Sequence, residues 1–158
     1  MKIQVKHSLK TDVGAAFKLC TEQKAQEAVY AKLGGSDLKI RREGRAPNVV
    51  LRISRKMPAN PPAAIKRLVP ATNDVSHTEK WAADGDGYEA DIAVEIKGVP
   101  VKIVGTKSLQ PEKGGSSVEW KFDISSSIPL LGSVIASFAG EELKKNLEDE
   151  YKVLKSSV

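Results

Sequence analysis

The side chains with the clearest capacity for chemistry are His77 and Glu79, which lie two residues apart in the segment NDVSHTEKWAA. In a β-strand, residues two apart share a face and are separated by about 7 Å along the chain, so contact between them depends on rotamers. An imidazole beside a carboxylate can act as an acid–base pair, as a cyclase or dehydratase would need. The same spacing more often belongs to a core histidine hydrogen-bonded by its neighbours.

No other pattern indicates a catalytic, metal or cofactor site. Cys20, the single cysteine, falls among apolar residues with Phe17 and Leu19, which predicts a small buried side chain rather than a nucleophile. The two histidines, His7 and His77, are far apart in sequence, and no second cysteine is available to complete a metal site. We therefore expect no cofactor and no metal.

Composition predicts one soluble globular domain over residues 1–158, with 41% hydrophobic and 28% charged residues. The net charge of +5 is spread along the chain rather than clustered with aromatic residues, so we expect no nucleic-acid partner. Weak attraction to an acidic lipid stays open. The N-terminal MKIQVKHSLK alternates and lacks a signal-peptide core, and the lone Cys20 cannot form an intramolecular disulfide. Both features favour a cytoplasmic location.

The periodicity of the chain predicts the elements that position these side chains. Residues 2–10 alternate as a strand with one wet face, and two short helices follow before Gly34 and Gly35. A proline-rich excursion, PANPPAAIKRLVP, interrupts the later strands, and about thirty C-terminal residues are helical. Six further strands are predicted within residues 36–43, 48–56, 73–83, 87–97, 100–109 and 116–125.

This order, β-αα-β6-α, predicts an α+β fold in which an antiparallel sheet of about seven strands covers its apolar face with the last helix. It resembles the START-like (SRPBCC) superfamily, which includes birch-pollen-allergen-like proteins and polyketide cyclases, and more narrowly a bacterial family of unknown function within it. The resemblance implies a helix-grip fold, a curved sheet wrapped around a long C-terminal helix, with an internal cavity for a hydrophobic or amphipathic molecule. It rests on IQVKHSLKTDVGAAFKLCTE, RKMPANPPAAIKRLVP, HTEKW and IPLLGSVIASF.

Strand parity places several polar side chains on the presumed cavity face, where each needs a partner, water or a ligand. These residues are His7, Arg42, Arg55, His77, Glu79 and Lys107. We hypothesise that His77 and Glu79, with Arg42 or Arg55, hold the polar head of a ligand. The aromatic residues expected around its apolar body are Trp81, Tyr88, Trp120 and Phe122, with Ile92 on the same face as Tyr88. The simpler interpretation is that these groups are satisfied core residues or reach solvent at strand ends.

The terminal helix carries two apolar stripes. One contains Leu131, Val134, Ile135 and Phe138, and the other contains Leu143, Leu147, Tyr151 and Leu154. Extended backwards, the second stripe becomes small at Gly140, Ala136 and Gly132, and we expect room for a ligand at Gly132 and Ala136. The first stripe needs cover from the early helices or the proline-rich excursion, or else it marks a membrane or partner contact. A break at Gly140 would bring both stripes onto the sheet.

Three functions are consistent with this pattern. The first is binding of a small hydrophobic or amphipathic ligand, lipid-like or polyketide-like, between sheet and helix. The second is a cyclase- or dehydratase-type enzyme using His77 and Glu79, and the third is a peripheral membrane or protein-interaction module. A transmembrane segment is not expected, because the apolar run is shorter than the about 20 residues that a span requires. Ligand identity and oligomeric state are left open.

Overall fold

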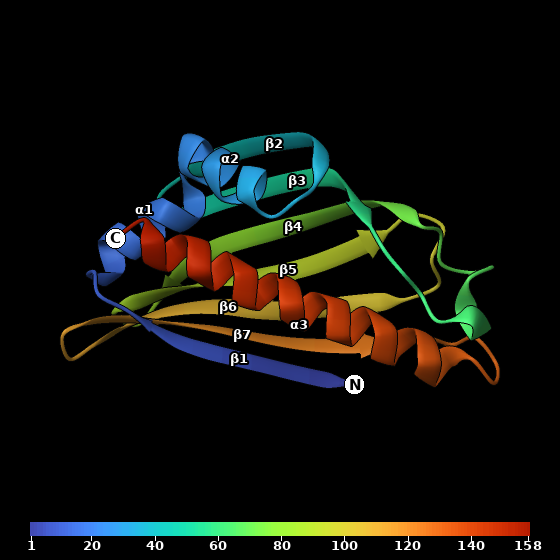
Figure 1. Cartoon of the computed structure of the whole chain (residues 1–158). Helices are drawn as coiled ribbons and strands as arrows, with labels where there is room; N and C mark the ends of the chain where they lie inside the picture. The colour runs from blue at the N-terminus through green and yellow to red at the C-terminus, as the bar shows by residue number, and fades with distance from the viewer.

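A seven-stranded antiparallel sheet curves around one long helix in the computed structural model, which describes residues 1–158 (Figure 1). Two short helices lie at one end of the sheet, and the proline-rich excursion lies at the other. The strands are β1 (Lys2–Leu9), β2 (Ser36–Arg45), β3 (Asn48–Pro58), β4 (Thr72–Asp84), β5 (Gly87–Ile96), β6 (Lys102–Glu112) and β7 (Gly115–Ser125). The helices are α1 (Val13–Thr21), α2 (Gln23–Lys32), the short 3-10 turn η1 (Ala63–Ile65) and α3 (Gly132–Ser156).

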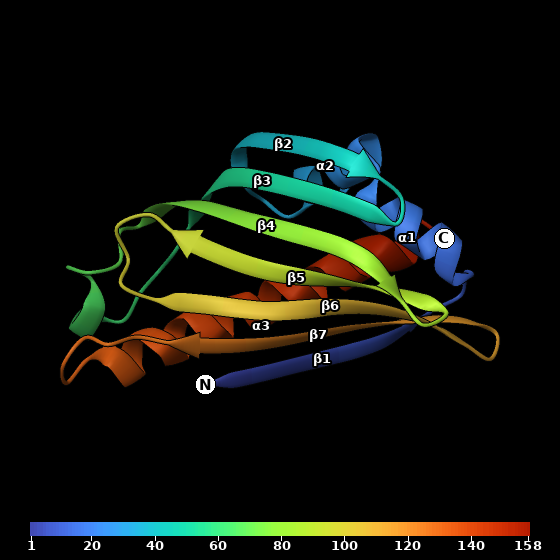
Figure 2. The ribbon, with the colours of Figure 1, turned by 180° about the vertical axis from the view of Figure 1, so that it is seen from behind.

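The strand order in the sheet is β1-β7-β6-β5-β4-β3-β2, and every neighbouring pair is antiparallel. Strands β2 to β7 follow one another across the sheet, as short connections require. The helices α1 and α2 carry the chain from β1 at one edge to β2 at the opposite edge (Figure 2). The predicted order β-αα-β6-α and the helix-grip fold are confirmed.

One face of the sheet is buried and the other faces solvent. On β3 the alternate residues Val49, Leu51 and Ile53 are buried, while their neighbour Arg52 is exposed. On β7 the same alternation buries Val118, Trp120, Phe122 and Ile124. The period of two predicted the inward face of β7 correctly, because a pleated strand turns successive side chains to opposite sides. On β3 the pattern was less clear, since Val50 is apolar on the opposite parity.

The helices α1 and α2 close one end of the sheet. Asp12 caps α1, where its carboxylate accepts a hydrogen bond from the Ala15 backbone N–H at 2.8 Å. The buried residues Phe17 of α1 and Tyr30 of α2 join the core beneath them. This end of the interior is therefore filled by side chains of the early helices.

The long helix α3 is unbroken through Gly140, so the predicted alternative of a break there is wrong. Its stripe Leu131, Val134, Ile135 and Phe138 packs with Ile65 and Val69 of the excursion and with Val99 of the β5–β6 connection. Ile135 is only 1% exposed. The excursion is thus the cover that the stripe needs, and it leaves Leu131, Val134 and Phe138 half-buried. No helix combines the length and apolar character needed to cross a membrane.

The small face of α3 brings the helix close to neighbouring segments instead of leaving room. A Cβ atom added at Gly132 would lie 2.6 Å from the Ser126 carbonyl oxygen, and one at Gly140 would lie 2.5 Å from the Met1 Sδ. Ala136, between them on the helix, is buried in the main core. Gly132 and Ala136, which we expected to border a ligand, do not line the cavity described below, because the missing side-chain volume is taken up by close packing.

Candidate functional site

A cavity lies between the sheet and α3, and Gly132, Ala136 and Gly140 are not among the residues that line it. It holds about 1100 Å³ of space free of atoms, counted out through its open mouth. Most of its lining side chains are hydrophobic, among them Ile92 and Val94 of β5, Phe122 of β7, and Phe138 and Leu143 of α3. Small-molecule sites are commonly lined in this way, mostly by apolar side chains with a few polar groups.

Polar side chains from β3 and β4 form one wall of the cavity. His77 Nε2 lies 3.0 Å from Glu79 Oε2, and the Trp81 indole N–H donates to Glu79 Oε1 at 3.0 Å. Burial of Glu79 opposes its ionisation, but the His77 hydrogen bond and the Lys107 charge outweigh burial and lower its pKa. Glu79 is therefore a buried carboxylate with both oxygens paired.

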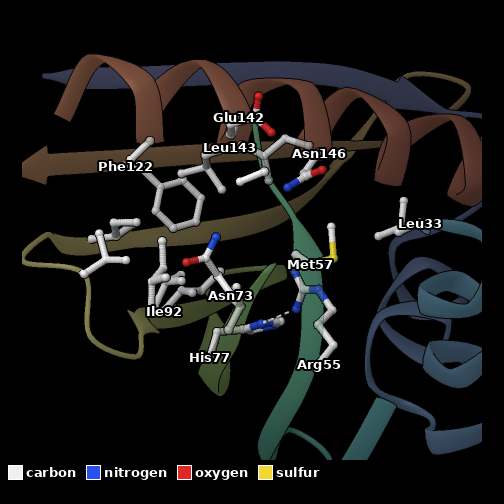
Figure 3. Close-up of a pocket in the computed structure, with 18 of the residues that line it drawn as sticks. Leu33, Arg55, Met57, Asn73, His77, Ile92, Phe122, Glu142, Leu143 and Asn146 are labelled. Atoms are coloured by element: carbon white, nitrogen blue, oxygen red, sulfur yellow. Dashed lines mark hydrogen bonds between the residues drawn. The ribbon is translucent and has the colours of Figure 1, made fainter. Parts of the chain in front are cut away.

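The contacts of His77 define which of its nitrogens carries the proton. Arg55 Nη1 lies 3.3 Å from His77 Nδ1, as the close-up shows (Figure 3). A guanidinium only donates hydrogen bonds, so Nδ1 must be the unprotonated acceptor and Nε2 must carry the hydrogen that Glu79 accepts. Tyr30 Oη lies 3.2 Å from the same Nε2. His77 is thus a neutral imidazole with both nitrogens engaged.

A buried ion pair continues this network below the cavity. Lys107 Nζ lies 3.3 Å from Glu150 Oε2, and the Tyr30 hydroxyl donates to Glu150 Oε1 at 3.4 Å. The ammonium lies 5.3 Å from the centre of the Trp120 ring, within cation–π range. Burial alone would lower the pKa of Lys107, but the acidic groups around it, led by Cys20 and Glu150, raise that pKa well above its ordinary value.

Two other buried groups near this ion pair, Cys20 and Tyr30, stay neutral at physiological pH. Burial raises the pKa of Cys20 to about 11, so the thiolate needed for nucleophilic attack is scarce. Cys20 is fully buried, which confirms its predicted place in the core. Burial, with the charges of Glu150 and Glu79, raises the pKa of Tyr30 well above its usual range. Nowhere do three His, Cys, Asp or Glu side chains gather in a way that could hold a metal ion.

The structure brings six of the predicted site residues to the cavity and leaves five outside it. Those that line it are Arg55, His77, Glu79, Ile92, Trp120 and Phe122. Those outside are Arg42, Trp81, Tyr88, Gly132 and Ala136. All sheet residues in both groups point to the predicted face of the sheet. Whether such a residue lines the cavity depends on which strand it belongs to and on its position along that strand.

Each misplaced sheet residue has a physical reason. Arg42 lies on the edge strand β2, and its Nε donates to the Thr21 carbonyl oxygen at the end of α1, 3.0 Å away. Tyr88 lies at the filled end of the sheet, where its ring stacks on Phe17 with centroids 3.9 Å apart. Trp81 lies at the same end, edge to face with Phe17, and contacts the network through Glu79 and through Lys107, whose Nζ lies 5.9 Å from the centre of its ring. Side chains of the early helices occupy the space that these residues were expected to share with a ligand.

Other polar residues predicted to face inward find partners within the protein. Lys107 pairs with Glu150, as described above. His7, near the sheet edge, lies 2.9 Å from Glu148 and stacks on Tyr151 with ring centroids 3.8 Å apart. Both residues have structural partners and neither lines the cavity.

Among the cavity residues that escaped the sequence analysis, three are polar and buried, namely Tyr30, Asn73 and Glu150. Two of them carried a usable signal. Asn73 has the parity of His77 on β4, and Glu150 lies three residues after Leu147 and four before Leu154, on the buried side of α3. Tyr30 carried none, since its place depends on how α2 folds back over the sheet.

Comparison with known proteins places this chain in a family. Residues 4–157 match the family described as "Protein of unknown function (DUF2505)". No curated protein matches the sequence.

Solved structures share the fold over nearly the whole chain. The protein TTHA0849 from Thermus thermophilus has a TM-score of 0.69 and 16% identity, over 99% of this chain and 95% of that one. The KanY protein has a TM-score of 0.68 and 15% identity, over 99% and 96% of the two chains. Ara h 8.0201, of the birch-pollen-allergen-like type, has a TM-score of 0.63 and 14% identity, again over 99% and 96%. The chain therefore belongs to the DUF2505 family and has the helix-grip fold of the START-like superfamily.

Proposed function

We propose that this protein binds a small amphipathic molecule in the cavity between its sheet and α3. The observation that carries the proposal is the cavity itself, apolar over most of its wall and polar along β3 and β4. Burying an apolar ligand body there removes it from water, at about 25 cal/mol for each Å². The polar wall would orient the ligand's head, with Arg55 and His77 as the nearest groups. The helix-grip fold adds support, since its members typically bind hydrophobic ligands.

A cyclase or dehydratase remains the second candidate, favoured by the contact of 3.0 Å between His77 and Glu79 at the cavity wall. Binding has the stronger support, because these groups engage each other. A general base needs a free lone pair facing its substrate, whereas both His77 nitrogens and both Glu79 oxygens already have partners.

The binding proposal is tested by filling the cavity with a larger side chain. Val94 of β5 lines the cavity, whereas its neighbour Ala93 is exposed on the opposite face of the same strand. We expect the neutral fluorescent probe N-phenylnaphthylamine to brighten on binding the natural protein. Val94→Phe should weaken this binding about tenfold or more, because the ring takes up ligand space. Ala93→Phe adds a comparable volume outside the cavity and should leave binding unchanged.

Fluorescence titration measures both affinities, and urea unfolding shows that both variants are folded. Absence of probe binding by the natural protein would overturn the proposal. Equal affinities for folded Val94→Phe and Ala93→Phe would place the probe elsewhere on the molecule.

A further inference from the structure

Two polar atoms of the cavity wall are buried without any hydrogen-bond partner. They are Arg55 Nε on β3 and Asn73 Oδ1 on β4. Asn73 is 6% exposed, and its amide nitrogen is already used by the Pro70 carbonyl oxygen at 2.9 Å. The only other buried side-chain atom of this kind, Gln26 Oε1, lies away from the cavity. Since buried polar atoms are nearly always paired, two such atoms on one cavity wall indicate a missing partner.

The two groups are close neighbours on the sheet. Arg55 pairs with Val75 and Met57 pairs with Asn73, so Arg55 and Asn73 are diagonal neighbours on the inward face of β3 and β4. Diagonal pairs of this type have Cα atoms about 7–8 Å apart, a span that one small head group bridges. Figure 3 shows Met57 beside Arg55 at this wall. Met57 is unbranched and flexible, so it can move aside when a head group enters.

Arg55 is also the cavity's cation without a carboxylate partner. It takes part in none of the molecule's salt bridges. Its hydrogen bond goes to the neutral His77, and its guanidinium lies 4.9 Å from the centre of the Tyr30 ring. Of the three carboxylates that line the cavity, Glu79 and Glu150 each have two hydrogen-bond partners, whereas the half-buried Glu142 of α3 has none. Arg55 therefore has donor capacity for an anion, which a planar guanidinium binds well.

We infer that the ligand is an amphipathic anion that also carries a hydroxyl group close to its charge. Its carboxylate accepts hydrogen bonds from Arg55, its hydroxyl donates to Asn73 Oδ1, and its apolar chain lies between Phe122, Phe138 and the rest of the cavity. This inference rests on the proposed binding function and specifies its ligand class. It explains both unpartnered atoms with one head group.

The test compares heads on a constant twelve-carbon chain, by displacement of N-phenylnaphthylamine. The competitors are β-hydroxydodecanoate, dodecanoate, dodecanol and dodecyltrimethylammonium. We expect dodecanoate to bind about tenfold or more tightly than dodecanol, since a hydrogen bond to a charged group is a strong one. The β-hydroxyl should add a further gain of about threefold. The ammonium compound should bind more weakly than dodecanol.

Variants assign these preferences to residues. Arg55→Met should lower dodecanoate affinity to that of dodecanol and leave dodecanol unchanged, whereas Arg55→Lys retains the charge and should keep part of the preference. Asn73→Ala should abolish the gain in affinity from the β-hydroxyl and leave the preference for dodecanoate over dodecanol unchanged.

The possible failures are distinguishable. If the natural protein binds the probe and dodecanol but shows no preference for the anion, or prefers the ammonium, this inference falls while the proposed function stands. If Arg55→Met weakens the binding of dodecanoate and of dodecanol equally, Arg55 affects the shape of the cavity and does not bind the head group. If neither the probe nor any competitor binds, the proposed function falls as well.

Discussion

Buried polar groups differ between the two ends of the space between the sheet and α3. At one end they have partners within the protein, and at the other end some do not. Toward the filled end, Lys107 is 1% exposed and does not line the cavity, and it pairs with Glu150 and lies over the ring of Trp120, two residues that do line it. At the cavity end, Arg55 and Asn73 each keep a buried atom without a partner. Both ends belong to the same sheet face beneath the same helix (Figure 1).

This difference separates polar groups that hold the fold from polar groups available to a ligand. A buried ion pair is destabilising to break, because removal of one partner leaves the other as an uncompensated charge. A buried polar atom without a hydrogen-bond partner already destabilises the free protein, because it has lost its hydrogen bonds to water. A ligand that supplies the missing partner removes this cost. A cation on the inner face of the sheet therefore has opposite expected roles at the buried Lys107 and the half-buried Arg55.

The largest effect should come from Lys107→Met at the filled end. The substitution leaves Glu150 buried without its cation, and we expect the free energy of unfolding to fall by about 3–5 kcal/mol. Urea unfolding at neutral pH measures this loss. The double variant Lys107→Met with Glu150→Leu removes both charges and should recover most of it. A loss below about 1 kcal/mol in the single variant would contradict a stabilising role for the pair.

A smaller effect is expected on the small face of α3, which the structure places against its neighbours and away from the cavity. Gly132→Ala puts a Cβ atom 2.6 Å from the Ser126 backbone carbonyl oxygen, so we expect a loss of about 1–3 kcal/mol. Gly140→Ala meets the ends of two side chains, the flexible Met1 and Ile3, whose Cδ1 would lie 3.3 Å away, and no backbone atom. Because alanine is favoured in a helix by about 1 kcal/mol, the change in stability should be near zero.

Thermal or urea unfolding distinguishes these two variants, and titration with N-phenylnaphthylamine supplies a second readout. Probe affinity should be unchanged in both variants. A weaker affinity for the probe in either folded variant would show that the small face of α3 borders the ligand. It would contradict the conclusion that this face is closely packed and separate from the cavity.

Much of the fold was predictable from the sequence, because its signals are local. Alternation along β3 and β7 showed which side chains point inward, and glycine and proline residues marked the turns between strands. The proline-rich excursion was also correctly offered as one possible cover for the stripe around Ile135.

The place of the cavity was not predictable, since it depends on contacts between distant segments. A row of small residues such as Gly132 and Gly140 is consistent with open space or with close approach, and only the position of the helix decides between them. Arg42 shows the same limit. Its side chain was correctly predicted to point to the inner face of the sheet. However, β2 is an edge strand, and there the Arg42 side chain meets the end of α1 and not the cavity.

The smallest effect on stability should come from Arg55→Met, and it sharpens the contrast with Lys107→Met most directly. The substitution removes one hydrogen bond, at 3.3 Å to His77, which costs about 0.5–1.5 kcal/mol. It also removes the buried Nε atom that has no partner, which offsets part of this cost. We therefore expect the free energy of unfolding to change by less than about 1 kcal/mol, measured by urea unfolding without ligand. A loss of unfolding free energy as large as that of Lys107→Met would make Arg55 a cation that stabilises the fold. A small loss, together with a lost preference for dodecanoate, would mean that the Arg55 charge serves ligand binding.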